Sequence, residues 1–207
     1  MSAPIFASVF GAAWTDLPPA LRKHYANRPF TRDRVTVTGR LDIRMGWLMR
    51  RIAPLMGALG MLTPADGAAV PCTVQFLSEA DSAAFIFERR FLFPGRKPYV
   101  FRSRLVRKRG SRVVEYMACG VGWDCEYSFA DGEVRLRHRG YVWRWFGADL
   151  PIGWLATPLL GRGEAVERAT GEDAFAMSMR LGGGLFGDAL TYAYAGRFTV
   201  TEMAIDG

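Results

Sequence analysis

Regular alternation of apolar and polar residues over much of residues 70–200 is the feature that most limits what this chain can fold into. Successive residues of a β-strand point to opposite faces, so alternation indicates strands that bury one face and expose the other. Glycine-containing turns separate the alternating runs. The main sets are Val70, Cys72, Val74 and Phe76; Val121, Trp123, Cys125, Tyr127 and Phe129; Val134, Leu136, His138 and Val142; Phe175, Met177, Met179 and Leu181; and Leu190, Tyr192, Tyr194, Phe198 and Val200.

Short turns between successive strands predict an antiparallel meander, because parallel strands need long crossover connections. About nine or ten strands are expected, and a sheet of that length usually curls. We therefore predict an α+β protein that is mainly β, with a curved antiparallel sheet in the form of a barrel or half-barrel. The 207-residue chain is long enough for one core and carries no linker-like tract, so residues 1–207 are taken as a single domain.

Helical patterns precede most of the alternating region. Apolar residues recur at helical spacing from Phe6 to Leu17, and Pro18-Pro19 restarts the chain as a second short helix. A half-buried strand is expected over residues 34–43, followed by a helix from about residue 46 to 61 that is kinked at Pro54. We expect these helices to cover an open face or end of the sheet.

Positive charge is concentrated in residues 88–112. Ten Lys/Arg and one acidic residue give this stretch a formal charge of +9, whereas the whole chain carries +7, so the remainder is slightly acidic. Such a cluster is typical of either a phosphate-binding surface or a solvated hairpin. Strand parity separates its aromatic residues from most of its arginines, whereas nucleic-acid platforms present both on one face. We therefore expect no nucleic-acid binding. An electropositive hairpin tip formed by Arg96, Lys97 and residues 107–109 stays open as a site for phosphate-bearing headgroups.

Arg89 departs from the pattern of its own strand, because it shares a face with Phe85, Phe87, Phe91 and Phe93. A buried charge needs a partner. Glu115 and Ser103 lie on the matching faces of the following strands, so we predict a polar cluster of these three side chains on the concave side. The cluster is either a core ion pair that fixes strand register or the polar anchor of a ligand pocket. The candidate ligand-binding residues are Arg89, Ser103, Glu115, His138, Tyr192 and Tyr194.

Catalytic signals are weak. A lone histidine such as His138 on an apolar face is more often a satisfied core group than a catalyst. Glu164 and Glu167 have opposite strand parity, which disfavours paired-carboxylate hydrolysis. The chain also has no nucleophile elbow. We therefore name no catalytic residue, and a protein that is not an enzyme is the favoured reading.

Metal and membrane signals are weak as well. Cys72, Cys119 and Cys125 have no zinc-ligand spacing and are expected to be reduced core thiols. The N-terminus lacks the basic region of a signal peptide, and the longest uncharged run of the best membrane candidate, residues 52–62, is far shorter than the roughly 20 residues that span a bilayer. We expect a cytoplasmic protein without a transmembrane segment or metal, and peripheral membrane contact stays open.

Six stretches can be taken together, in chain order: LPPALRKHY, FERRF, FRSRL, VVEYMACG, LPIGWLATPLLGRGEAVE and DALTYAYAGRF. They resemble a bacterial domain-of-unknown-function family that occurs alone or fused behind an NAD(P)-binding domain of the saccharopine dehydrogenase type. The family's W-x-R-x-F pattern starts with Phe87 here, and its histidine after LPP is either His24 or replaced by Tyr25. No GxGxxG follows a strand, so we expect no dinucleotide cofactor on this chain.

Three functions fit these observations. Curled antiparallel sheets lined by Phe, Tyr, Trp and Met often enclose ligands, which favours binding of an apolar or amphiphilic, lipid-like small molecule. The family resemblance implies an alternative, an accessory subunit that docks on a separate NAD(P)-dependent reductase. An enzyme without a recognisable motif is the third.

Overall fold

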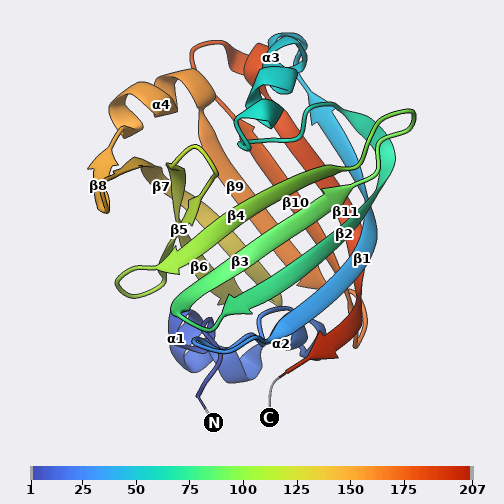
Figure 1. The fold of residues 1–207 in the computed structure, drawn as a ribbon, viewed down its shortest axis with the longest axis vertical. Coiled ribbons are helices and arrows are strands. Elements are labelled where there is room, and N and C mark those ends of the chain that lie inside the picture. The colour runs from blue at the N-terminus through green and yellow to red at the C-terminus, as the bar shows by residue number, and fades with distance from the viewer. Residues whose placement is uncertain (1, 206–207) are drawn as a thin grey trace.

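The alternating strands close into an antiparallel barrel whose two ends are covered by helices (Figure 1). The structure, a computed structural model, describes residues 2–205. Its elements in chain order are α1 (Ala7–Phe10), η1 (Gly11–Asp16), α2 (Pro19–His24), β1 (Arg34–Met45), α3 (Trp47–Ala58), β2 (Gly67–Glu79), β3 (Ser82–Phe91), β4 (Tyr99–Arg107), β5 (Arg112–Tyr116), β6 (Val121–Ala130), β7 (Glu133–Trp145), β8 (Ala148–Pro151), α4 (Gly153–Leu160), β9 (Arg162–Ala169), β10 (Ala174–Gly182), η2 (Gly187–Leu190) and β11 (Tyr192–Ala204).

Ten strands form the ring, and β8 extends it as a flap paired with β7. The ring closes because β6 pairs with β7 as well as with β5, while β1 pairs with β11. The predicted class is thereby confirmed: the protein is mainly β and antiparallel, with N-terminal helices and a helix after the first strand that contains Pro54. Helix α4 was not predicted, because its sequence is apolar on all sides and gives no helical period.

The N-terminal segment plugs one end of the barrel, at the bottom of Figure 1. Phe6 packs against Tyr25, Phe85 and Tyr127 with ring centroids 4.5, 5.0 and 5.2 Å apart, so aromatic rings fill this end. Asn27, which follows α2, donates from Nδ2 to the carbonyl oxygens of Asp33 and Phe76 at 2.8 and 3.1 Å. The plug is therefore tied to the barrel rim by both packing and hydrogen bonds.

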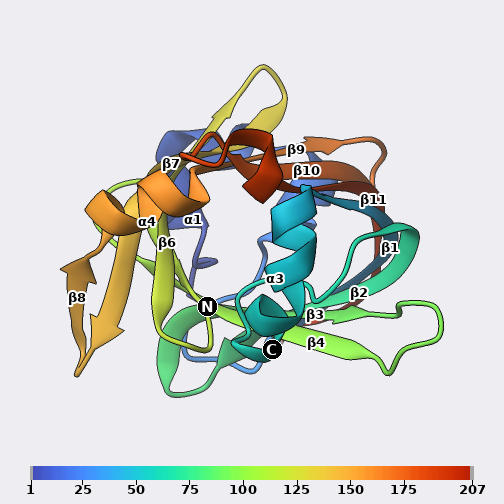
Figure 2. The same ribbon diagram turned by 90° about the horizontal axis from the view of Figure 1, so that it is seen from above.

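The opposite end is covered by α3, α4 and η2, and Figure 2 shows α3 lying across it. The Tyr99 hydroxyl donates to the carbonyl oxygens of Gly57 and Leu62 at 3.0 and 2.9 Å, which anchors the end of α3 and the loop after it. Gly46 lets α3 start close to η2, because a Cβ there would lie 2.0 Å from the Asp188 carbonyl oxygen. No helix in residues 2–205 is long and apolar enough to cross a bilayer.

The basic stretch does not form one electropositive tip, so that sequence-based expectation is wrong. Arg96 and Lys97 lie in the β3–β4 turn, whereas residues 107–109 lie at the β4–β5 turn, at the other end of a nine-residue strand. Nine residues of strand separate the two groups by about 30 Å. Between them, Arg104 pairs with Glu79 on the outer surface at 3.1 Å. The charge is thus divided between two separate places.

Candidate functional site

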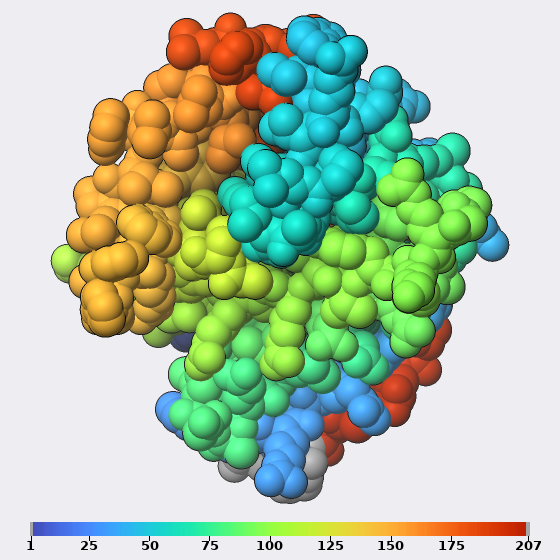
Figure 3. All heavy atoms as spheres, turned by 45° about the horizontal axis from the view of Figure 1, so that its top comes forward, coloured from blue at the N-terminus to red at the C-terminus, as the bar shows by residue number. Residues whose placement is uncertain are grey.

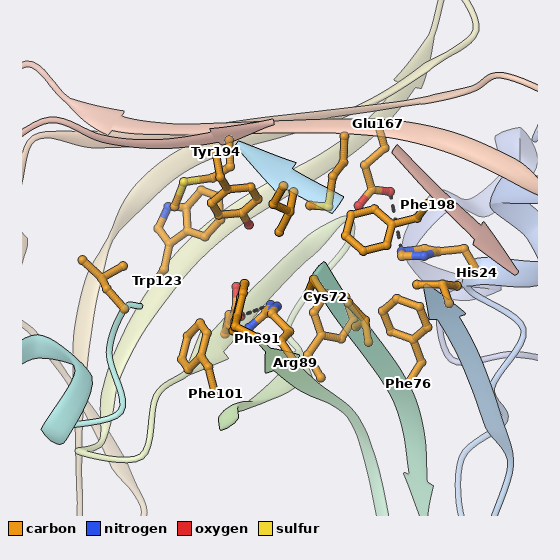
Figure 4. A pocket seen from close by; sticks show the side chains of 18 of the residues that line it. His24, Cys72, Phe76, Arg89, Phe91, Phe101, Trp123, Glu167, Tyr194 and Phe198 are labelled. Carbon is orange, nitrogen blue, oxygen red and sulfur yellow. Dashed lines mark hydrogen bonds and ion pairs between the residues drawn. The ribbon is translucent and has the colours of Figure 1, made fainter. Parts of the chain in front are cut away.

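The barrel interior contains a cavity of about 60 Å³, several times the space one water needs (Figure 4). Aromatic and aliphatic side chains form most of its wall. Polar groups enter from two places, near Arg89 and Glu115 in the middle and near His24 and Glu167 toward the plug. The apolar lining includes Val37, Leu41, Val74, Phe76, Phe87, Phe91, Phe101, Phe175, Met177 and Phe198.

A second cavity of about 50 Å³ lies next to the first, toward α3 and α4. The two cavities share five lining residues, and three of these are methionines, whose unbranched side chains change shape easily. Gly163 leaves space for the indole of Trp123, since a Cβ there would lie 3.0 Å from the ring. The shared residues that separate the chambers are Met61, Leu62, Met117, Trp123 and Met179.

The predicted polar cluster is present on the inner wall. Arg89 Nη2 donates to Glu115 Oε1 at 2.7 Å, and Arg89 Nη1 donates to Ser103 Oγ at 3.1 Å. The Ser103 hydroxyl donates in turn to Glu115 Oε1 at 2.6 Å. The three side chains come from β3, β4 and β5, and the strand parity that suggested the cluster is what brings them to one face.

The charged side chains of this cluster are buried, where an unpaired charge would be costly. The side chains of Arg89 and Glu115 are each only 11% exposed. Burial alone would lower the pKa of the Arg89 guanidinium, but Glu115 raises it, so Arg89 stays charged. Its guanidinium also lies 4.7 Å from the ring centroids of both Phe87 and Phe101, a cation–π arrangement. Arg90, on the outer face, is exposed.

The other predicted site residues are placed differently. Tyr192 and Tyr194 line the cavity, and the Tyr192 hydroxyl lies 3.0 Å from Thr63 Oγ1. His138 lines neither chamber. Its Nδ1 accepts a hydrogen bond from Trp123 Nε1 at 3.0 Å, so it supports a residue of the wall and does not itself face the interior. A ligand-binding role for any of these side chains stays a prediction.

His24, Tyr25 and Glu167 form a second polar group that no sequence pattern identified as a site. The Tyr25 hydroxyl donates to Glu167 Oε2 at 2.6 Å, and His24 Nε2 lies 3.6 Å from the same oxygen, beyond hydrogen-bond distance. Neither ring nitrogen of His24 has a hydrogen-bond partner among the described protein atoms. Figure 4 shows the imidazole and the Glu167 carboxyl directed toward each other at the cavity wall.

Helix α2 and strand β9 bring this group together. Pro19 begins α2, and Ala20, Leu21 and His24 form its buried face. Glu167 lies on the inward face of β9 with Gly163. Parity alone could have revealed Glu167, because it is the one carboxylate on a face otherwise built from small residues. The hydrogen bond between Tyr25 and Glu167, however, joins residues 142 apart in sequence, so no local pattern shows it.

Burial sets the protonation of these side chains. Burial, with a smaller effect from the charge of Arg89, lowers the pKa of His24 to about 3, so the imidazole is neutral at ordinary pH. Burial raises the pKa of Glu167 to about 7, although the Tyr25 hydrogen bond and the charge of Arg89 oppose the rise. The 3.6 Å contact is therefore not an ion pair near neutrality. Groups that titrate near neutrality inside a cavity are typical of functional sites.

Neither a metal site nor a reactive thiol at the cavity wall is suggested by the described residues. No group of three or more His, Cys, Asp and Glu side chains in residues 2–205 is arranged to hold a metal ion. Cys72 lines the cavity, and burial raises the pKa of its thiol to about 12 against the opposing charge of Arg89, which makes it unreactive.

The sequence matches the family described as domain of unknown function DUF4166 over residues 17–198, so the chain belongs to that family. No curated protein matches it. Among solved structures, the dehydratase domain of the polyketide PpsC from Mycobacterium tuberculosis aligns over 93% of this chain and 84% of its own, with 12% identity and a TM-score of 0.19. The H959F variant of that domain aligns over 98% and 85%, with 10% identity and a TM-score of 0.19. Scores this low carry no argument about the present chain.

The first prediction concerns the Arg89 cluster. Replacing Arg89 by Met leaves the Glu115 carboxylate in apolar surroundings, and breaking a buried pair from one side costs about 3 to 5 kcal/mol. Arg89→Met should therefore lower the free energy of unfolding in urea far more than Arg90→Met. The double variant Arg89→Met, Glu115→Leu should recover much of the loss because no charge is left unpaired. Equal losses for Arg89→Met and Arg90→Met would contradict the assignment.

The second prediction concerns pH. Folding raises the pKa of Glu167 from 4.5 to about 7, so its contribution to stability is full below the lower value and is lost as pH rises through the upper one. The wild type should lose up to about 1.4 kcal/mol per pH unit relative to Glu167→Gln between about pH 5 and pH 7. His24 contributes the opposite slope in both proteins, so the difference isolates Glu167.

Urea unfolding at a series of pH values measures this difference. Glu164→Gln is the matched control, because Glu164 lies on the same strand with its side chain on the exposed face. A control that reproduces the Glu167→Gln profile would show that the effect does not arise from the buried carboxyl.

Proposed function

We propose that this barrel binds an apolar or amphiphilic small molecule in its interior. The observation that carries the proposal is the mainly apolar chamber inside the barrel, into which a few buried polar groups project. Ligand sites in proteins combine the same two features, a largely apolar wall and a small number of convergent polar groups. A core that served stability alone would favour satisfied or apolar side chains at these positions.

The wall can adapt to a ligand larger than the present space. The shared methionines Met61, Met117 and Met179 stand between the two chambers, and a change in their rotamers would join the chambers into one. The strands of a closed barrel hold the rest of the wall in place. Adaptation is therefore concentrated toward α3 and α4, which makes this end the route for ligand exchange.

The same end carries exposed apolar side chains. Trp154 of α4 is 78% exposed and Leu185, in the loop that packs on α4, is 79% exposed. Figure 3, in which this end comes forward, shows α3 in cyan and α4 in orange at the surface. Helix α3 adds exposed Trp47 and Arg51, whose guanidinium lies 5.7 Å from the Trp47 ring, while its other arginine, Arg50, pairs with Asp66 at 2.7 Å. Interfacial tryptophans beside cations suit an anionic bilayer surface, so we assign this end to membrane contact during ligand exchange.

The alternative of docking on an NAD(P)-dependent reductase concerns the same surface. The resemblance to chains fused with saccharopine-dehydrogenase-type domains motivates it, and exposed apolar side chains suit a protein partner as well as a bilayer. Arg51, which lies beside Trp47 on α3, favours the bilayer, whereas Arg50 is neutralised by Asp66.

Binding in the cavity is tested with the neutral fluorescent dye phenylnaphthylamine and by native mass spectrometry of freshly purified protein. The dye should bind the wild type with enhanced, blue-shifted fluorescence. Val74→Phe fills the cavity with an added ring and should abolish binding, at a stability cost of about 1 to 3 kcal/mol. Gln75→Phe, on the outer face of the same strand, should leave binding unchanged. Equal binding by the two variants would place the dye outside the barrel.

Membrane contact is tested by sedimentation with phosphatidylglycerol vesicles. The double variant Trp154→Ser, Leu185→Ser should lose at least about tenfold in vesicle affinity, because two exposed apolar anchors are removed. Phe30→Ser is the matched control, because Phe30 is 62% exposed but lies near the plugged end. Added salt should weaken wild-type binding. If the wild type does not sediment with these vesicles, membrane contact is refuted and a protein partner becomes the better occupant.

A further inference from the structure

His24 is the one buried side chain in residues 2–205 whose nitrogen atoms both lack a protein partner. Its side chain is 3% exposed, and it lines the cavity. Aromatic rings surround it on three sides, with the centroids of Tyr25, Phe76 and Phe175 at 4.2, 4.2 and 4.8 Å. A neutral imidazole has one donor and one acceptor, and leaving such groups unpaired when buried is costly. Both groups are therefore unpaired in the described structure, with Nε2 facing Glu167 Oε2 at 3.6 Å, and a ligand must enter beside this pair to satisfy them.

The charges around His24 are already balanced. Arg89, from β3, is neutralised by Glu115 at 2.7 Å. Glu167, from β9, accepts a hydrogen bond from the Tyr25 hydroxyl. Its carboxyl is protonated below neutral pH, because burial raises its pKa to about 7. The remaining neighbours, Phe76 and Phe175, are uncharged. A ligand at this position meets hydrogen-bonding groups and no unpaired cation.

Resting on the ligand-binding function proposed above, we infer that the polar end of the ligand is a neutral hydroxyl or carbonyl group held by His24 beside Glu167. A hydroxyl can donate to one imidazole nitrogen, and a carbonyl can accept from the other. Either group satisfies a buried polar atom without bringing a charge into an apolar chamber.

Charged ends fit less well. A carboxylate would be desolvated beside the Glu167 carboxyl, and the only nearby cation in the cavity wall, Arg89, is already committed to Glu115. An ammonium group would require ionised Glu167, whose buried surroundings favour the protonated form. The site therefore selects uncharged oxygen over either ion.

The position of His24 also sets the direction of the ligand. His24 and Glu167 lie toward the plugged end, whereas the second chamber, toward α3 and α4, is lined by Met56, Leu160 and other largely apolar residues. An apolar tail attached to the polar end would run past Trp123 into that chamber. The ligand class is thus a slender apolar molecule with one uncharged oxygen function at its inner end.

Competition against bound phenylnaphthylamine at about pH 6 tests the inference, with decanol, decanoate and decylamine as three probes of equal chain length. Decanol should displace the dye at least about tenfold more effectively than either ion. His24→Leu should weaken decanol about tenfold while dye affinity stays within about twofold. His24→Gln, which keeps a donor and an acceptor, should retain decanol binding within about threefold.

The outcomes separate this inference from the proposed function. If the dye does not bind the wild type, the ligand-binding function fails and the inference fails with it. If the dye binds but decanol affinity is the same in wild type and His24→Leu, only the inference is overturned. Stronger displacement by decanoate or decylamine overturns it as well. Dye binding by His24→Leu also reports that this variant is folded.

Discussion

Pairing between β1 and β11 ties the beginning of the sheet to its end, and the rest of the structure depends on it. The two strands run antiparallel from Arg34 opposite Ala204 to Met45 opposite Tyr192. Together with the β6–β7 pairing, this ladder closes the sheet into a ring, so that no strand of the ring keeps a free edge. Closure turns side-chain alternation into a division between inside and outside. Every inward residue then faces the same barrel interior, which holds both chambers.

Two polar groups lie in this interior, and they differ in how many of their hydrogen-bonding atoms have protein partners. Arg89, Ser103 and Glu115 are joined by three hydrogen bonds, so the buried charges of Arg89 and Glu115 are paired. His24 has no such partner among the described protein atoms. In the Arg89 cluster, positive and negative charge cancel. In the group around His24, the imidazole keeps one donor and one acceptor without a partner among residues 2–205. The two groups thus differ in how far they are paired within the protein, although Arg89, Glu115, His24 and Glu167 all line the same cavity.

The two ends of the barrel differ in how tightly they are packed. Aromatic rings around Phe6 and the hydrogen bonds of Asn27 fix the plugged end. The α3 and α4 end is covered by helices and lined by methionines, and it exposes Trp47 and Trp154 to the outside. Under the ligand-binding function proposed above, the plugged end would hold the polar end of the ligand and the α3 and α4 end would admit its tail.

Much of this architecture follows from the sequence itself. The period-two pattern determined the strands, and the turn residues determined their antiparallel order. Parity even brought Arg89, Ser103 and Glu115 to one face, because neighbouring strands in a meander place their inward residues side by side. These are local or nearest-neighbour relations, so they can be read along the chain.

Features that depend on contacts between distant parts of the chain were decided only by the tertiary structure. Closure through β1–β11 joins strands about as far apart as the chain allows, and no local pattern specifies it. The basic stretch looked like one patch because its residues are close in sequence, yet β4 carries its two halves to opposite ends of the strand. His24 and Glu167 meet because α2 enters the end of the ring beneath β9. Sequence determined which side chains face inward, and closure of the barrel decided which of them meet there, since that depends on the ring's three-dimensional path.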